Sequence, residues 1–238
     1  TKVLIISKNY PVKKYIKRGY LMYIVIVGAG GIGQRLAEIA LKDKHNVIII
    51  DKNQEKCEAV ARKTDAIVIN ADATKEETLE ESEIKKADVL VTTTGDDAVN
   101  LMVVSLAKNK GVKTLISIVN NEESKPMFME KGVKIVKNPN IVMAEHLYKS
   151  ITHPTVEDYM NVGEHVEIFR VPLPENSKLS GKTIKNIGLP NKSLIVAIER
   201  DHKFIIPTED VEVYAGDKLT VLAHKDQVDR VVKLLTGG

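Results

Sequence analysis

The sequence feature that most constrains the fold is a glycine-rich turn between two segments of different periodicity. An apolar run over residues 23–27 leads into Gly28-Ala29-Gly30-Gly31-Ile32-Gly33, and apolar residues then recur at helical spacing up to about Lys44. The next apolar run, 46–50, ends at Asp51. A strand, a G-x-G-x-x-G turn, a helix and an acidic residue after the following strand are typical of a mononucleotide- or dinucleotide-binding fold.

The residue types of this motif suit nucleotide chemistry. We expect Gly28 to make the tight turn, Gly30 to let the backbone approach a pyrophosphate, and Gly33 to let the helix pack close to the strand. N–H groups at the helix start bind phosphate oxygens. Asp51 would accept a ribose 2′-hydroxyl and repel a 2′-phosphate, which favours NAD over NADP, although Lys52 weakens that exclusion. ATP, ADP and AMP carry the same hydroxyl, and a glycine turn without a ligand stays an alternative.

Two further polar segments follow strands of the same pattern. Residues 70–74 come after the third strand, and residues 92–97 come after the fourth. Because the carboxyl ends of parallel strands form the ligand crevice of an open α/β sheet, both segments are candidates for contacts with adenine or phosphate. The candidates in them are Asp72, Ala73, Thr93, Thr94, Gly95 and Asn100. Thr74 and Asp96 also suit helix capping, which is compatible with binding.

Strands and helices alternate strictly up to residue 136. The further expected strands are 66–69, 87–92, 114–119 and 134–136, and the expected helices are 54–63, 75–85, 97–110 and 122–131. We expect Cys57, Val60 and Ala61 on the inner face of one helix, and Val99, Met102, Val103 and Leu106 on that of another. The pattern predicts an α/β fold with a Rossmann-like doubly wound parallel sheet, whose Val- and Ile-rich strands are covered on both faces.

After Pro154 the strict alternation of strands and helices ends, and the pattern becomes that of a second, smaller α+β domain. We expect strands at 166–171 and 218–222, a short helix at 182–187, a hairpin of 194–199 and 203–206, and a terminal helix capped by Asp226. A further helix over 139–150 would be capped by Asn138. The expected divisions are a basic leader or linker (1–21), a nucleotide-binding domain (22–138), a crossover helix and linker (139–163) and the second domain (164–238).

Charge and composition exclude several classes of function. The chain has 35 Lys and Arg and 32 Asp and Glu, but six of the basic residues and no acidic one fall within residues 1–21. The remainder is mildly acidic, which gives no electrostatic case for nucleic acid, and only 4% of residues are aromatic. A single cysteine, Cys57, excludes an internal disulfide and a multi-cysteine zinc site. No apolar run reaches the roughly 18 residues of a membrane span.

Residues 1–21 are either a leader or a basic arm that contacts a membrane partner.

Together these motifs resemble a known family. The glycine turn, Asp51, the 72–74 box, the 94–97 turn with Asn100, and residues 119–121 are similar to the N-terminal RCK (TrkA-N) domain. The run from Val171-Pro172 through residues 179–184, then 195–198 and the turn at 216–217, resembles the companion TrkA-C domain. The resemblance covers essentially residues 22–236.

The resemblance implies a cytosolic regulator of a potassium transporter or channel, held at the inner face of the membrane by that partner. It implies binding of NAD(H), or of ATP or ADP, with contacts from residues 28–32, Asp51, Thr94 and Gly95. Many relatives carry an arginine that reaches the phosphates where this chain has Ser117. It also implies homodimers within rings through helix 139–151, whose apolar stripe is Ile141, Val142, Ala144, Leu147 and Ile151; the stripe alone would equally suit a helix that covers its own sheet.

Two alternatives stay open beside a non-catalytic ligand sensor. One is an NAD-dependent oxidoreductase, and the other is an RCK-type sensor for a partner outside potassium transport. A Tyr10/Lys14 pair lies before the first strand, on the wrong side of the glycine turn for a dehydrogenase, and the six histidines are scattered. The acidic run 76–83 suits a solvated helix face, or a divalent-cation site shared between chains. We therefore assign no catalytic residue and no metal ligand.

Overall fold

The computed structural model describes residues 4–6, 21–136 and 138–237. The chain divides into two compact units, Thr1–Ile141 and Val142–Gly238. The division falls just inside the helix that we expected to connect the domains, α6 (Pro139–Thr152). Among the described residues, no helix combines the length and the apolar character that crossing a bilayer requires.

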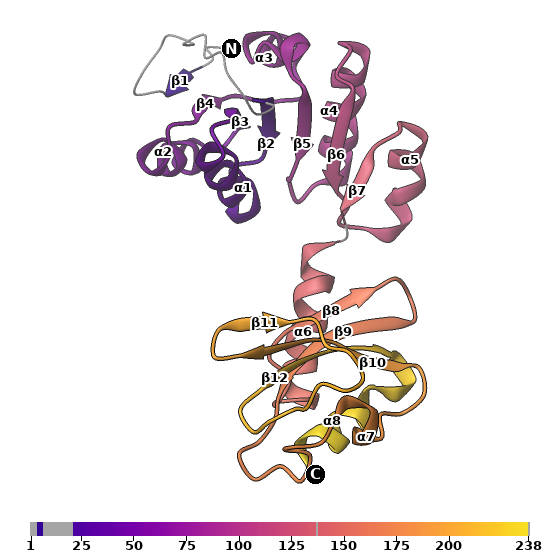
Figure 1. The fold of residues 1–238 in the computed structure, drawn as a ribbon. Coiled ribbons are helices and arrows are strands. Elements are labelled where there is room, and N and C mark those ends of the chain that lie inside the picture. Colours follow the sequence, from indigo (N-terminus) through magenta and orange to yellow (C-terminus); the bar gives the residue numbers. More distant parts are fainter. Residues whose placement is uncertain (1–3, 7–20, 137, 238) are drawn as a thin grey trace. The chain divides into compact units, whose positions relative to one another are not determined.

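The first unit contains a seven-stranded sheet in the order β1-β4-β3-β2-β5-β6-β7 (Figure 1). Its strands are β1 (Leu4–Ile6), β2 (Tyr23–Val27), β3 (Asn46–Asp51), β4 (Ile67–Asn70), β5 (Val89–Thr92), β6 (Thr114–Ile118) and β7 (Lys134–Val136). The six strands from β2 to β7 are parallel, which confirms the predicted doubly wound sheet. β1 pairs antiparallel with β4, so these three residues of the expected leader belong to the sheet. The rest of that segment up to residue 20, with Tyr10 and Lys14, lies outside the described residues.

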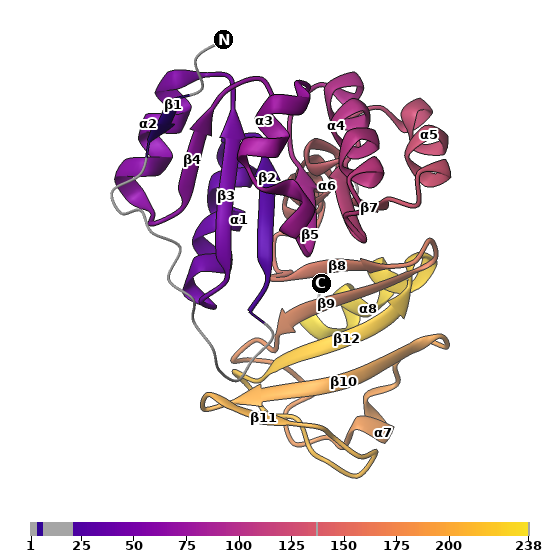
Figure 2. The ribbon, with the colours of Figure 1, turned by 90° about the horizontal axis from the view of Figure 1, so that it is seen from above.

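Helices cover both faces of this sheet because its strands send alternate residues to opposite sides (Figure 2). Ile24 and Ile26 of β2 join a core with α1 and α2, whereas Val25 and Val27 join a core with α3, α4 and α5. The helices are α1 (Gly31–Lys42), α2 (Gln54–Lys63), α3 (Glu76–Glu81), α4 (Asp97–Asn109) and α5 (Lys125–Glu130). Short 3-10 turns, Ile84–Lys86 and Glu122–Ser124, follow α3 and precede α5.

Two helical details differ from the sequence-based expectation. The predicted helix 75–85 ends at Glu81, because Glu83 takes a left-handed backbone conformation with φ 50°. On α4 the buried positions are Asn100, Val103, Val104 and Ala107, while Met102 is 49% exposed. The buried stripe therefore lies one helical position away from the predicted one, and Met102 points to solvent. Cys57 and Val60 on α2 are buried as expected.

The second unit is built on a five-stranded antiparallel sheet in the order β11-β10-β12-β9-β8. Its elements are β8 (Tyr159–Val162), β9 (Val166–Pro172), α7 (Ile184–Ile187), β10 (Ser193–Arg200), β11 (Lys203–Ile205), β12 (Lys218–His224) and α8 (Val228–Thr236). Phe169, Val171, Leu219 and Val221 turn inward from alternate positions of β9 and β12 onto the side chains of α8. This confirms a small α+β domain.

The second unit differs from the expected one at two places. The predicted linker reaches residue 163, but Tyr159–Val162 forms β8 and pairs with β9, so the second fold begins earlier. Asp226 does not cap the last helix; its carboxylate lies 2.7 Å from His224 Nδ1, and Gln227 stands at the N-cap without a side-chain hydrogen bond.

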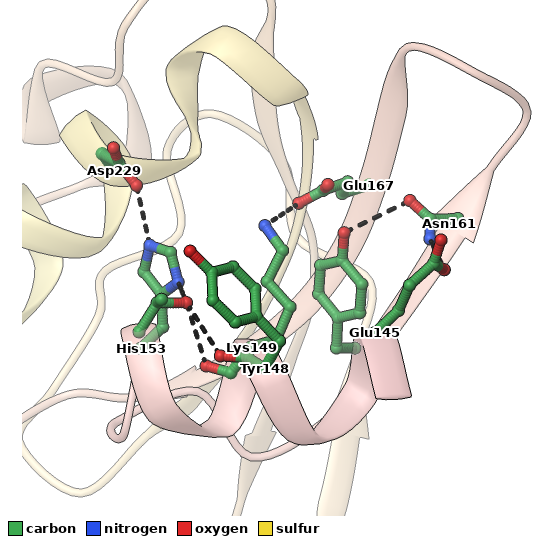
Figure 3. A network of polar contacts seen from close by, with 9 residues as sticks. Glu145, Tyr148, Lys149, His153, Asn161, Glu167 and Asp229 are labelled. Carbon is green, nitrogen blue, oxygen red and sulfur yellow. Dashed lines mark hydrogen bonds and ion pairs between the residues drawn. The ribbon is translucent and has the colours of Figure 1, made fainter. Parts of the chain in front are cut away.

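Within the second unit, α6 is fastened to the sheet and to α8 by polar contacts (Figure 3). Lys149 Nζ lies 3.1 Å from the carboxylate of Glu167, a β9 residue only 2% exposed. His153 Nε2 lies 2.7 Å from Asp229 on α8. Burial, followed by the neighbouring Glu167 carboxylate, raises the pKa of the Tyr159 hydroxyl. Because one side chain of the Lys149–Glu167 pair is buried, removing either partner alone would leave an uncompensated charge.

We predict that Gly33→Ala destabilises the first unit. A Cβ at Gly33 would stand 1.9 Å from the carbonyl oxygen of Gly28, so helix and strand would have to separate. The expected loss is about 1–3 kcal/mol of unfolding free energy, measured by urea denaturation. Gly95→Ala is the matched control, because no atom lies within 4 Å of the Cβ it would add. Equal stability of the two variants would contradict the close packing of α1 against the turn.

Candidate nucleotide site

The glycine turn connects β2 to α1 in a conformation that only small residues allow. Gly28 has φ +109°, and its N–H donates to Ile50 O at 2.8 Å. A Cβ at Gly28 would meet Thr93 Oγ1 at 2.7 Å, so the turn also packs against the end of β5. Gly30 is different: its backbone is extended, with φ −71°, and no atom lies within 4 Å of an added Cβ. The space above Gly30 is therefore open to a ligand.

The start of α1 offers hydrogen-bond donors to that space. Gly30 is the N-cap and supplies no side-chain hydrogen bond, and the first turn of the helix carries no acidic residue. The first N–H groups of a helix have no intrahelical acceptor, and the helix dipole adds partial positive charge there. This arrangement suits a phosphate group.

Asp51 holds the glycine turn from the neighbouring strand. Its Oδ2 accepts the Ala29 N–H at 2.7 Å, and its Oδ1 accepts the Asn53 N–H at 2.8 Å. Its main-chain oxygen accepts the Ala71 N–H at 3.1 Å and the Asn70 side-chain amide at 3.0 Å. Asp51 thus joins the ends of β3 and β4 to the turn. Each carboxylate oxygen keeps a second lone pair with which to accept a hydroxyl.

The segment after β4 forms a second wall. Asp72 Oδ1 accepts both the N–H of Thr74, at 2.9 Å, and its hydroxyl, at 2.7 Å. The Thr74 hydroxyl, followed by the Thr74 N–H, lowers the pKa of the Asp72 carboxyl. We expected Thr74 to cap a helix, but the N-cap of α3 is Lys75, which makes no side-chain hydrogen bond to the helix. The Thr74 hydroxyl instead donates to Asp72 within the loop.

The segment after β5 is held from behind by a buried amide. Asn100 is fully buried, and its Oδ1 accepts the hydroxyl of Thr94 at 2.7 Å, while its Nδ2 donates to Thr94 O at 3.0 Å. Asp96 caps α4 as predicted, accepting from Ala98 and Val99. Asn100 therefore supports the loop, and its expected role as a ligand contact stays a prediction. Ser117 is also fully buried, and its hydroxyl is bonded to Thr92 at 2.7 Å.

These segments surround a cleft of about 450 Å³ in the first unit. Nine predicted residues line it: Gly28, Gly30, Asp51, Lys52, Asp72, Ala73, Thr93, Thr94 and Gly95. Five predicted residues do not line it, namely Ala29, Gly31, Ile32, Gly33 and Asn100; the first four belong to the turn and the start of α1. Seven further residues line the cleft that the sequence analysis did not name as contacts: Val27, Ile50, Lys56, Ala71, Thr74, Asp96 and Val99. Lys56 was detectable, because the Asn53 cap places it in the first turn of a helix that starts beside Asp51.

Cys57 and two glutamates of the acidic run, which the sequence analysis singled out, have structural partners. Cys57 is buried, and burial, followed by the nearby Asp51 carboxylate, raises the pKa of its thiol. Glu76 and Glu80 of the acidic run each lie 3.0 Å from Lys110 Nζ. In the part of the chain that the structure describes, no three His, Cys, Asp or Glu side chains gather as a metal-ion site would require.

Comparison with known proteins identifies both units. The TrkA-N domain family matches residues 24–139, and the TrkA-C domain family matches residues 168–236. The Trk system potassium uptake protein TrkA homolog of Methanothermobacter thermautotrophicus is 34% identical over 91% of this chain and 100% of its own length. The homolog of Pyrococcus abyssi is 29% identical over 90% of this chain and 97% of its own length.

Among solved structures, the GsuK RCK domain is 24% identical with a TM-score of 0.50, and the match covers 91% of this chain and 47% of that one. At this level of identity the likeness concerns the fold alone. The relatives over their full length, together with the two domain matches in the same order, decide the family. The chain belongs to the family of Trk system potassium uptake protein TrkA homologues, built from a TrkA-N and a TrkA-C domain.

Proposed function

We propose that this chain is a cytosolic regulatory subunit that binds NAD(H) or an adenine nucleotide and thereby controls a potassium transporter or channel. The observation that carries the proposal is the cleft between the glycine turn, Asp51 and the Thr93–Gly95 loop. The relatives support the potassium partner, because their names assign them to Trk potassium uptake. A place at the inner face of the membrane, held there by that partner, is part of the proposal.

The cleft divides into parts that match those of an adenine nucleotide. The start of α1 beside Gly30 would take the phosphates, because it presents N–H donors without an acidic neighbour. Asp51 would accept the ribose hydroxyls through its remaining lone pairs. Ala71 and Ala73 would provide apolar surface for the base, and the exposed Lys52 and Lys56 also line the cleft.

The bonding of the lining carboxylates favours binding over catalysis. Asp51 accepts two backbone N–H groups, Asp72 accepts an N–H and a hydroxyl from Thr74, and Asp96 accepts two N–H groups of α4. Hydrogen bonds of this kind fix the orientation of the side chain. Groups so held are better suited to shaping a site than to transferring protons.

A hydrogen-bonded path leads from the cleft toward α6. Thr94 O, in the cleft loop, accepts the Asn120 side-chain amide at 3.1 Å. Asn120 O accepts the Asn138 side-chain amide at 2.6 Å, and Asn138 Oδ1 caps α6 by accepting the Asn140 N–H at 2.9 Å, as the sequence predicted. A ligand that prefers one arrangement of Thr94 would therefore bias the start of α6, and the protein would respond by population shift.

The exposed side of α6 suits a second copy of the chain. Its apolar side chains are uncovered: Ile141 43%, Val142 46%, Met143 57%, Leu147 57%, Tyr148 64% and Ile151 76% exposed. Contiguous apolar surface of this kind marks an interaction site. Lys149 and His153 meanwhile fix the same helix to its own unit. We propose that α6 forms a homodimer, from which larger rings can be built.

We predict that Gly30→Val abolishes nucleotide binding and leaves the fold intact. Valine tolerates the extended backbone of Gly30, and its Cβ would meet no protein atom within 4 Å, so we expect its side chain to enter the space proposed for the ligand. Isothermal titration calorimetry with ADP and NADH measures the binding, and urea unfolding measures the stability. Wild-type affinity in a folded Gly30→Val protein would contradict the phosphate site. Ile39→Val, on the exposed side of α1, is the control.

We also predict that Leu147→Asp dissociates the dimer. It would place a charge in the middle of the exposed apolar side of α6, where burial against a second copy is unfavourable. Multi-angle light scattering should show the wild type as a dimer or a larger assembly and the variant as a smaller species. Ser150→Asp adds the same charge at an exposed polar position of α6 and should leave the mass unchanged. A Leu147→Asp protein with the wild-type mass would refute this interface.

A further inference from the structure

We infer that the cleft of the first unit takes an adenosine mononucleotide, of the AMP or ADP class, and that no second nucleoside is accommodated beside it. The inference rests on the proposed function, because it names which of the proposed ligands fits the site. It is carried by a hydrogen-bonded cluster at the ends of β5 and β6, outside the cleft.

A doubly wound sheet has two nucleoside-binding halves. A dinucleotide lies across the point where the strand order reverses, with one nucleoside on each half. In this sheet the reversal lies between β2 and β5, so the first half is β2, β3 and β4 and the second is β5, β6 and β7. A dinucleotide would therefore need space above the ends of β5 and β6 as well as above those of β2 and β3.

The cleft occupies the first half and stops at the edge of the second. Its lining residues come from the ends of β2, β3 and β4, and from the segment between β5 and α4. Val99, in the first turn of α4, is the last of them in the chain, and no described residue of β6 or of the segment after it is among them. The cleft is thus bounded, on the side of the second half, by the segment between β5 and α4.

At the second half, the protein's own polar groups are bonded to one another. The Asp97 carboxylate accepts three hydrogen bonds from the segment that follows β6. Asn120 donates its N–H and its side-chain amide to Oδ1, both at 2.9 Å, and Asn121 donates its N–H to Oδ2 at 2.8 Å. A second ribose or phosphate above the end of β6 would therefore find these two N–H groups already satisfied.

Two neighbours keep this cluster in place. The Asn120 side chain also donates to Thr94 O, and Asn138, itself only 8% exposed, donates to Asn120 O at 2.6 Å. Beneath them Thr92 and Ser117 are fully buried and bonded to each other. A nicotinamide nucleoside would have to break several bonds to the ionised Asp97, whereas a mononucleotide breaks none.

Calorimetry on the whole chain with AMP, ADP, ADP-ribose and NAD⁺ tests the inference. ADP-ribose adds a second ribose to ADP, and NAD⁺ adds the nicotinamide. We expect AMP or ADP to bind, and ADP-ribose and NAD⁺ to bind equally or more weakly than ADP. Tighter binding of NAD⁺ than of ADP would overturn the inference and leave the proposed function standing. Binding of none of the four would overturn the proposed function, and the inference with it.

The variant Asp97→Ala tests whether this cluster sets the preference for ADP over NAD⁺. Asp97→Ala removes the acceptor of three hydrogen bonds, so the affinity for NAD⁺ relative to ADP should rise several-fold. Glu123→Ala, an exposed change in the same segment, should leave that ratio at the wild-type value. An unchanged ratio in a folded Asp97→Ala protein would overturn the role of this cluster. The wild-type comparison of ADP with NAD⁺ decides the inference even where that variant fails to fold.

Discussion

The first unit depends on the bonds that Asp51 makes to backbone N–H groups outside its own strand. Its carboxylate takes the Ala29 N–H of the glycine turn and the Asn53 N–H at the start of α2. Charge-assisted hydrogen bonds of this kind are stronger than neutral ones. They hold the turn in the position that leaves Gly30, the N-cap of α1, open to the cleft. One carboxylate thus supports both the local fold and the proposed ribose contact.

Buried polar side chains have different partners in the two units. In the first unit buried polar side chains bond one another near the carboxyl edge of a parallel sheet, where a ligand is expected. Asn100 holds the loop after β5, and Ser117 joins β6 to Thr92 of β5. In the second unit the buried carboxylates of Glu167 and Asp217 are paired with Lys149 and Arg200. There the ion pairs fasten α6 and the β10–β12 region. The helix that carries the exposed apolar side chains is therefore positioned by its own unit.

Much of this structure could be predicted from the sequence, because period and turn chemistry are local. The 23–27 strand, the helix 54–63 and the doubly wound parallel sheet follow directly from them. The sequence could not reveal that Leu4–Ile6 pairs with β4 or that Tyr159–Val162 extends the second sheet, since both pairings are long-range and the strands are short.

At the site, the turn and Asp51 were identifiable from their motif. The role of Asn100 as a support of the loop could not be predicted from the sequence. A polar side chain one turn into a helix serves equally well as a ligand contact or as a loop support. The same limit applies to Asp97 and Asn120, whose pairing becomes visible only when the ends of β5 and β6 lie side by side.

The most direct test of the account is the affinity of the Asp51→Ala protein for ADP, measured by isothermal titration calorimetry beside the wild type. The account predicts binding several-fold weaker than wild type, because both the ribose acceptor and the anchor of the glycine turn are lost. An affinity equal to that of the wild type would contradict the central claim that Asp51 and the glycine turn together form the nucleotide site.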